Sequence, residues 1–158
     1  MKQITLLFLL IVQSTIAQNS LFNQIEAKNI GPTIMSGRVV DLAVNPKNPT
    51  EFYVAYATGG LWYANNNGTS FTPVMDSAET VNCGSVTVDW NSGTIWVGTG
   101  EVNASRSSYA GVGVLKSSDK GKTWENLGLK DSHHISRIWV NPSNLNEIVV
   151  AAVGHLYT

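Results

Sequence analysis

The side chains best suited to chemistry fall in two short polar segments, residues 101–110 and 130–134. The first segment contains Glu101, Asn103, Arg106, Ser107, Ser108 and Tyr109, and the second contains Asp131, His133 and His134. A few polar groups beside an aromatic ring are what proteins use to recognise a polar ligand. For any single one of these residues the alternative is an ordinary solvated loop side chain. As a group, Glu101, Asn103, Arg106, Tyr109, Asp131 and His134 are the candidate ligand-binding residues.

The histidines and the cysteine of the sequence give little indication of a metal site or a reactive thiol. His133 and His134 are adjacent, and neighbouring residues on a strand point to opposite faces of a sheet, so they are poorly placed to share one ion. Cys83 is the only cysteine, so no intrachain disulfide can form, and a role as a small buried apolar side chain is expected. The sequence therefore predicts no metal and no cofactor.

The elements that position these segments are marked by a turn motif at residues 117–124. Its defined positions are Ser117, Asp119, Gly121, Thr123 and Trp124, and their spacing matches an Asp-box, the hairpin signature of bacterial neuraminidase repeats in β-propellers. Asp119 is predicted to accept turn N–H groups two residues on, and Gly121 to supply a positive φ. Trp124 starts the return strand and is predicted to bury its ring between neighbouring sheets. The motif indicates a fold, and a structural role for Asp119 is favoured over a catalytic one.

Decayed copies indicate that this motif is part of a repeat. Asn66 lies 53 residues before Asp119, and Phe71 lies 53 residues before Trp124. An Asn-Pro element at residues 44–51 recurs at 140–147, with a middle member at 88–91, so the steps between copies are 44 and 52 residues. Periods of about 40–50 residues with several short strands each are typical of propellers.

Period-two alternation places the strands within each repeat. The first repeat has strands at 39–44, 52–57, 60–64 and 70–74, with Val40, Leu42 and Val44 on one face. The second has strands at 85–90, 94–99, 113–117 and 124–127, and the third has strands at 135–140 and 148–153, with the next one starting at 156–158. The sequence predicts an all-β chain, a β-propeller fragment with two four-stranded antiparallel blades and most of a third.

Propeller topology then predicts where a ligand would bind. The connections from second to third strand and from fourth strand to the next blade share one face, where propeller ligands usually bind. Residues 101–110 and 130–134 both belong to that face, whereas the Asp-box turns lie opposite. The extra length of the second repeat falls at 101–110, where the first repeat passes directly from Ala57 to Gly60.

The N-terminus predicts the compartment. Lys2 precedes an apolar run at residues 4–12, and Ala17 ends a stretch of small residues, so residues 1–17 are expected to be a secretory signal peptide, too short to span a membrane. Its removal leaves 9 basic against 11 acidic side chains, which gives no reason to expect nucleic acid or an anionic membrane as partner. We expect a secreted, periplasmic or cell-surface protein with no membrane insertion after cleavage. Propellers close with about four to eight blades, so residues 18–158 are expected to be the N-terminal part of a propeller whose remaining blades are its first partner.

A further set of short segments is spread over nearly the whole mature sequence, at residues 29–32, 36–39, 59–62, 97–101, 113–119, 128–132, 134–138 and 150–155. These segments resemble large secreted bacterial Asp-box proteins, which are commonly labelled glycosyl hydrolase or sortilin N-terminal domain. It implies a propeller of the sortilin or xyloglucanase type.

The catalytic residues of such hydrolases are not found at the matching positions. Sialidases open their arginine triad with an Arg-Ile-Pro segment, which does not occur here, and the three arginines Arg38, Arg106 and Arg137 have a simpler reading as surface or strand-end residues. Xyloglucanases carry an aspartate two residues before a Gly-Gly pair in the first blade, where this chain has Ala57. We therefore expect a module that binds an extracellular protein or glycan in a sortilin-like manner. The alternatives are a glycoside hydrolase with its acids in other blades, and a structural module of a surface assembly.

Overall fold

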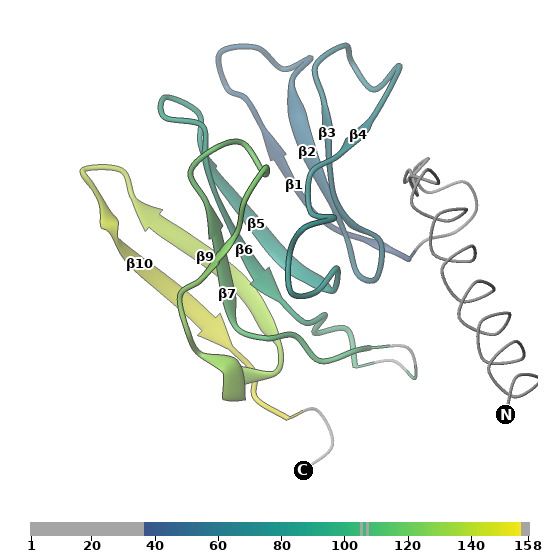
Figure 1. Cartoon of the computed structure of the whole chain (residues 1–158), viewed down its shortest axis with the longest axis vertical. Coiled ribbons are helices and arrows are strands. Elements are labelled where there is room, and N and C mark those ends of the chain that lie inside the picture. The colour runs from purple at the N-terminus through teal and green to yellow at the C-terminus, as the bar shows by residue number, and fades with distance from the viewer. Residues whose placement is uncertain (1–36, 105, 107, 156–158) are drawn as a thin grey trace, which may run out of the picture.

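The computed structural model describes residues 37–104, 106 and 108–155. These residues form three antiparallel sheets that stand side by side (Figure 1). The first has the order β1 (Val39–Val44), β2 (Phe52–Tyr56), β3 (Gly60–Ala64), β4 (Thr72–Pro73). The second has the order β5 (Cys83–Asp89), β6 (Thr94–Thr99), β7 (Val114–Ser117), β8 (Glu125–Asn126). The third pairs β9 (Ile135–Asn141) with β10 (Asn144–Ala152), after a 3-10 turn, η1 (Lys130–Ser132).

The two four-stranded sheets are blades of a β-propeller, as the repeats predict, and the two-stranded sheet is part of a third blade. The first strands of the blades are neighbours, because β1 contacts β5 and β5 contacts β9. The predicted strands are all present within the described residues, with bounds that move by a few residues, most at the short fourth strands and at the start of β10. The predicted signal peptide and the strand at 156–158 lie outside the described residues. In the part of the chain described, no helix has the length and apolar character needed to cross a membrane.

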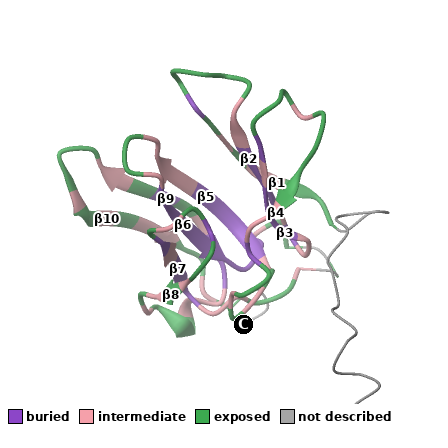
Figure 2. Ribbon diagram, turned by 45° about the horizontal axis from the view of Figure 1, so that its top comes forward, coloured by how far each residue is buried: buried purple, intermediate pink, exposed green. Residues whose placement is uncertain are grey.

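The core consists of two apolar layers between blades, which Figure 2 shows as the buried stretches of the central strands. Between the first and second blades the layer is made by Tyr53, Ala55, Leu61, Met75, Cys83, Val86, Ile95, Val97 and Leu115. Between the second and third blades it is made by Trp96, Val114, Ile135 and Ile138. Each fully buried aliphatic side chain contributes about 1.5–3 kcal/mol, so both faces of the second blade are fixed by packing.

A β-bulge changes the predicted orientation of the first strand. The register between β1 and β2 shifts between Val39 and Asp41, and a bulge reverses the side-chain alternation beyond it. Val40 and Ala43 therefore pack against the core, while Leu42 and Val44 are exposed. The prediction that Val40, Leu42 and Val44 share one face is wrong for this reason.

The 117–124 motif forms the turn between β7 and β8, where the sequence places it. Asp119 Oδ1 accepts the backbone N–H groups of Lys122 and Thr123 at 3.0 and 2.9 Å, three and four residues on rather than the two we expect. Ser117 Oγ accepts the Gly121 N–H at 2.8 Å, and Gly121 has φ 88°. The Trp124 indole N–H donates to the Val74 carbonyl at 3.0 Å, which fastens the second blade to the end of the first.

The 53-residue repeat is visible in the same geometry. Asn66 Oδ1 accepts the Ser70 N–H at 3.1 Å, four residues on, as Asp119 does with Thr123. Asn67 and Gly68 have φ values of 57° and 78°, close to the 63° and 88° of Lys120 and Gly121. An amide thus forms the same turn in the first blade that a carboxylate forms in the second.

Candidate functional site

The two polar segments predicted from the sequence meet at one end of the sheets. We call this end the loop face and define it by the connections at 57–60, 74–82, 100–113 and 127–134. The Gly111 N–H donates to the His133 carbonyl at 2.7 Å, and the Gly100 N–H donates to the Asn82 carbonyl at 2.9 Å. The Asn82 side-chain amide donates to the Ala110 carbonyl at 3.1 Å. The long 101–110 loop is therefore tied at its base to both neighbouring connections.

Glu101 is the buried anchor of this loop rather than a projecting charge. The Glu101 side chain is 1% exposed. The Arg38 guanidinium binds both carboxylate oxygens: Nε donates to Oε1 at 2.7 Å, and Nη2 donates to Oε2. The Asn103 amide and the Ser108 hydroxyl donate to the same carboxylate at 3.0 and 3.3 Å. The hydrogen bond with Glu101 raises the pKa of Arg38 above its ordinary value. A bidentate arginine–carboxylate pair of this kind fixes the relative orientation of the two side chains as well as pairing their charges.

Arg38 is the residue that sequence reasoning missed. It precedes β1 and was expected to be a surface or strand-end side chain, yet it reaches a glutamate 63 residues later in the chain. The sequence gives only a weak indication of this pairing, namely an arginine at the edge of a strand and a glutamate at the start of an unusually long loop. Glu101 lies in the loop by which the second repeat is longer than the first, so the repeat alone could not pair it with Arg38.

The remaining candidates divide into exposed and buried groups. Tyr109 is 57% exposed, and Asn103, Arg106 and Asp131 are exposed as well, so these four side chains are open to a ligand on the loop face. His134 is instead 5% exposed, and its backbone is fixed by bonds to the Ser132 carbonyl and from the Val153 N–H. Its burial differs from the expectation that it projects from the loop face.

The histidines do not build a metal site with acidic or thiol neighbours. His133, with φ 55°, stacks on His155 with ring centroids 3.7 Å apart, whereas its ring centroid lies 6.5 Å from that of His134. Among the described residues, no three histidine, cysteine, aspartate or glutamate side chains gather closely enough to hold an ion. The exposed side chains of this face offer hydrogen bonding, charge pairing and stacking on Tyr109.

The position matching the xyloglucanase aspartate is part of the protein interior. Ala57 is 1% exposed, and its N–H donates to the Arg38 carbonyl at 2.8 Å. Two residues on, the Gly59 carbonyl accepts the Trp62 indole N–H at 2.7 Å. The first-blade connection from Ala57 to Gly60 is thus a tight turn with no acidic group of its own.

Comparison with solved structures supports the propeller fold. No family model and no curated protein matches the sequence. An ancestral GH74 enzyme superposes with a TM-score of 0.58 at 24% identity, over 74% of this chain and 14% of its own. The GH74 enzyme of Niastella koreensis superposes with a TM-score of 0.50 at 23% identity, over 69% of this chain and 16% of its own. This chain therefore shares the fold of a small part of each enzyme, and the likeness shows the fold alone.

Proposed function

We propose that this chain belongs to a secreted β-propeller that binds an extracellular glycan through its loop face. The observation that carries the proposal is the Arg38–Glu101 pair, which holds in place a loop that the repeat does not need for folding. The first blade makes the same connection with the short turn from Ala57 to Gly60. A loop that is lengthened and then anchored by an ion pair to a buried carboxylate is well suited to present side chains to a ligand.

The exposed residues of the loop favour a glycan over other ligands. Tyr109 offers an aromatic ring, and Asn103, Arg106 and Asp131 offer hydrogen-bond donors and acceptors of both charges. Stacking on a ring combined with hydrogen bonds at its edge suits sugars, which have apolar faces and many hydroxyl groups. The names of the two solved neighbours, both GH74 enzymes, support the same ligand class. A protein ligand bound in a sortilin-like manner is the other outcome of the tests below.

Glycoside hydrolysis is a second candidate function, favoured by the shared fold with GH74 enzymes. Hydrolysis of a glycosidic bond uses two carboxyl groups about 5–10 Å apart. Both oxygens of Glu101 are engaged by Arg38, and Asp131 is the only other candidate acid on the two segments. A hydrolase would therefore need acids contributed from outside these segments, and binding is the function that the described side chains can perform themselves.

The experiment is a glycan array probed with the full-length protein, followed by calorimetry with the best glycan. Tyr109→Ala should weaken binding by about 1–2 kcal/mol if the ring is a hot spot. Tyr109→Phe keeps the ring and should retain most of the affinity. Neither variant should change the melting temperature, because the side chain is exposed. Wild-type affinity in Tyr109→Ala would exclude this loop from the site, and release of reducing ends from xyloglucan would favour the hydrolase.

A further inference from the structure

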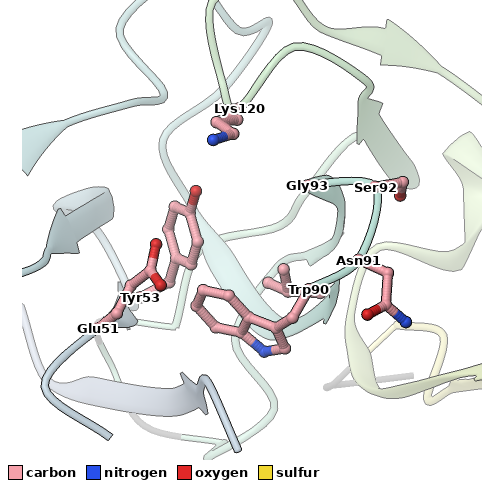
Figure 3. A pocket seen from close by; sticks show the side chains of 8 residues that line it. Glu51, Tyr53, Trp90, Asn91, Ser92, Gly93 and Lys120 are labelled. Carbon is pink, nitrogen blue, oxygen red and sulfur yellow. The ribbon is translucent and has the colours of Figure 1, made fainter. Parts of the chain in front are cut away.

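A groove of about 300 Å³ lies between the first and second blades, at the end of the sheets opposite the loop face (Figure 3). We call it the inter-blade groove; its lining residues are Glu51, Tyr53, Val88, Trp90, Asn91, Ser92, Gly93 and Lys120. Its volume is at the lower end of the range of about 300–1,000 Å³ found for ligand pockets. A ligand that fills it would therefore be small, about the size of one or two sugar rings.

Two aromatic rings form the floor of the inter-blade groove. Tyr53 comes from the first blade and Trp90 from the second, and their rings lie 5.5 Å apart at 40°. The Tyr53 residue is 3% exposed, and no hydrogen bond from its hydroxyl is formed within the described part of the chain. Figure 3 shows this hydroxyl turned toward Lys120 across the groove. Because Tyr53 lines the groove, its hydroxyl can donate a hydrogen bond to a ligand and accept one from it.

Glu51 supplies a fixed carboxylate at the edge of the floor. Its Oε1 accepts the Tyr63 hydroxyl at 2.5 Å, and its Oε2 accepts the Asn45 amide at 2.7 Å. These two hydrogen bonds, the one from Tyr63 first, lower the pKa of Glu51 from its ordinary value. Each carboxylate oxygen has a second lone pair, so Glu51 can accept further hydrogen bonds from a bound molecule.

Lys120 supplies an ammonium group on the other side of the groove. The 117–124 turn gives it φ 63°, and its aliphatic stem lies over Gly93, where a Cβ would come within 3.1 Å of the lysine Cε. Among the described residues, its ammonium group forms no ion pair within 4 Å. The turn that closes the second blade thus also directs a cation toward the groove.

We propose that the inter-blade groove is a second binding site, which holds one ring of an uncharged short saccharide against Trp90. The negative charge of Glu51 and the positive charge of Lys120 offset each other, so neither an anion nor a cation is favoured. A sugar ring has an apolar face for the indole, and its hydroxyl groups match the Glu51 carboxylate, the Tyr53 hydroxyl and the Lys120 ammonium. The site lies at the opposite end of the blades from Tyr109 and does not depend on the function proposed for the loop face.

The next junction between blades shows that the groove is not a general product of the repeat. A smaller space of about 110 Å³ lies between the second and third blades, and its lining includes Val140, Pro142 and Leu145. Pro142 stands at the repeat position of Trp90. The indole that forms part of the floor at the first junction is therefore not repeated at the second.

The test uses the full-length protein and three neutral disaccharides, cellobiose, maltose and lactose, in saturation-transfer NMR and calorimetry. Lys120→Asn and Tyr53→Phe each remove one polar group, and the expected result is a loss of about 3- to 10-fold in affinity for the disaccharide that binds best. Asparagine is chosen because Asn67 already forms the same turn in the first blade, with φ 57°. Lys122→Ala, an exposed lysine of the same turn outside the groove, is the matched control and should bind as wild type.

The proposal is overturned if none of the three disaccharides shows saturation transfer, or if Lys120→Asn binds as tightly as wild type. It is also overturned if Tyr109→Ala alone abolishes disaccharide binding, because that result places the ligand on the loop face. Should Tyr53→Phe fail to fold, Lys120→Asn decides the question by itself. If Tyr109→Ala still binds the disaccharide and Lys120→Asn binds it more weakly, the disaccharide occupies the inter-blade groove and not the loop face. This outcome does not depend on whether the loop face has the function proposed for it.

Discussion

The Arg38 guanidinium holds both oxygens of the Glu101 carboxylate, which joins the start of β1 to the loop that follows β6. The glutamate is 1% exposed while the arginine side chain is 44% exposed, so the charge pair lies at the boundary of the protein interior. The pair links two blades at a point where neither residue is required by the repeat. Its structural effect is to fix the base of the loop that carries Arg106 and Tyr109.

Glu101→Gln should loosen this loop. The amide cannot accept both donors of the guanidinium, and leaving a buried polar group poorly paired costs about 1–3 kcal/mol. We expect a lower melting temperature and faster tryptic cleavage after Arg106 in limited proteolysis. The control is Lys130→Met, which removes an exposed ion pair with Glu79 at 3.8 Å, and such pairs contribute about 0–1 kcal/mol. Equal cleavage rates in Glu101→Gln and wild type would contradict an anchoring role.

The Asp119 turn should make stability depend on pH in the acid range. The Thr123 hydroxyl, followed by the Thr123 N–H and the Ser117 hydroxyl, lowers the pKa of Asp119 from 3.8 to about 2. Because the carboxylate is favoured in the folded state, its contribution is complete above the unfolded pKa of 3.8 and is lost as the pH falls through about 2.

Asp119→Asn should therefore melt at a lower temperature than wild type at neutral pH, and the difference should shrink between about pH 4 and pH 2. Thermal melts over this range measure it. Asp131→Asn changes an exposed acid on η1 and should melt as wild type throughout. A difference between Asp119→Asn and wild type that stays constant down to pH 2 would show that the charge of Asp119 does not stabilise the turn.

The sequence predicts the blades well because their determinants are local. Alternating apolar residues and glycine or asparagine turns specify both bounds of β6 and place β5 and β7 to within two residues. The 53-residue copy places the first-blade turn at Asn66 and Gly68. The bulge in β1 is not predicted, because Val39 to Asp41 include no glycine or proline that would mark a change of register.

The candidate site is predicted less well because its determinants are distant in sequence. A glutamate on a long loop has the same pattern whether it is solvated or buried, and burial of Glu101 depends on a partner 63 residues away. The inter-blade groove likewise brings together Tyr53, Trp90 and Lys120 from three distant parts of the sequence. Only the packing of one blade on the next shows that these side chains face a common space.

Cys83 should be inert to alkylation in the native protein. Its side chain is 0% exposed in the layer between the first two blades, and burial raises the pKa of its thiol to about 12. Because the thiolate is the reactive form, iodoacetamide at neutral pH should label it only after denaturation in urea. Intact-mass measurement follows the reaction, and rapid labelling of the folded protein would mean that the two blades separate on the timescale of the experiment.

Two glycines of the loop face should respond very differently to the same substitution. Gly100 and Gly128 both have positive φ, 83° and 104°, so alanine is strained at either position. At Gly128 the added Cβ would meet nothing within 4 Å, and the expected cost is the backbone strain alone, about 1–2 kcal/mol.

At Gly100 the added Cβ would lie 1.9 Å from the His133 carbonyl oxygen and 2.7 Å from the Gly111 nitrogen. Backbone atoms on both sides must then move, and overpacking of this kind adds about 1–3 kcal/mol or more to the strain. Urea denaturation should rank Gly100→Ala as the less stable variant, and its loop-face ligand affinity should fall as well, since Gly100 immediately precedes the 101–110 loop. Gly128→Ala should keep that affinity. If the two variants are equally stable, the backbone at Gly100 has room for a Cβ, and the second and third blades are packed less closely there than the Gly100–His133 contact indicates.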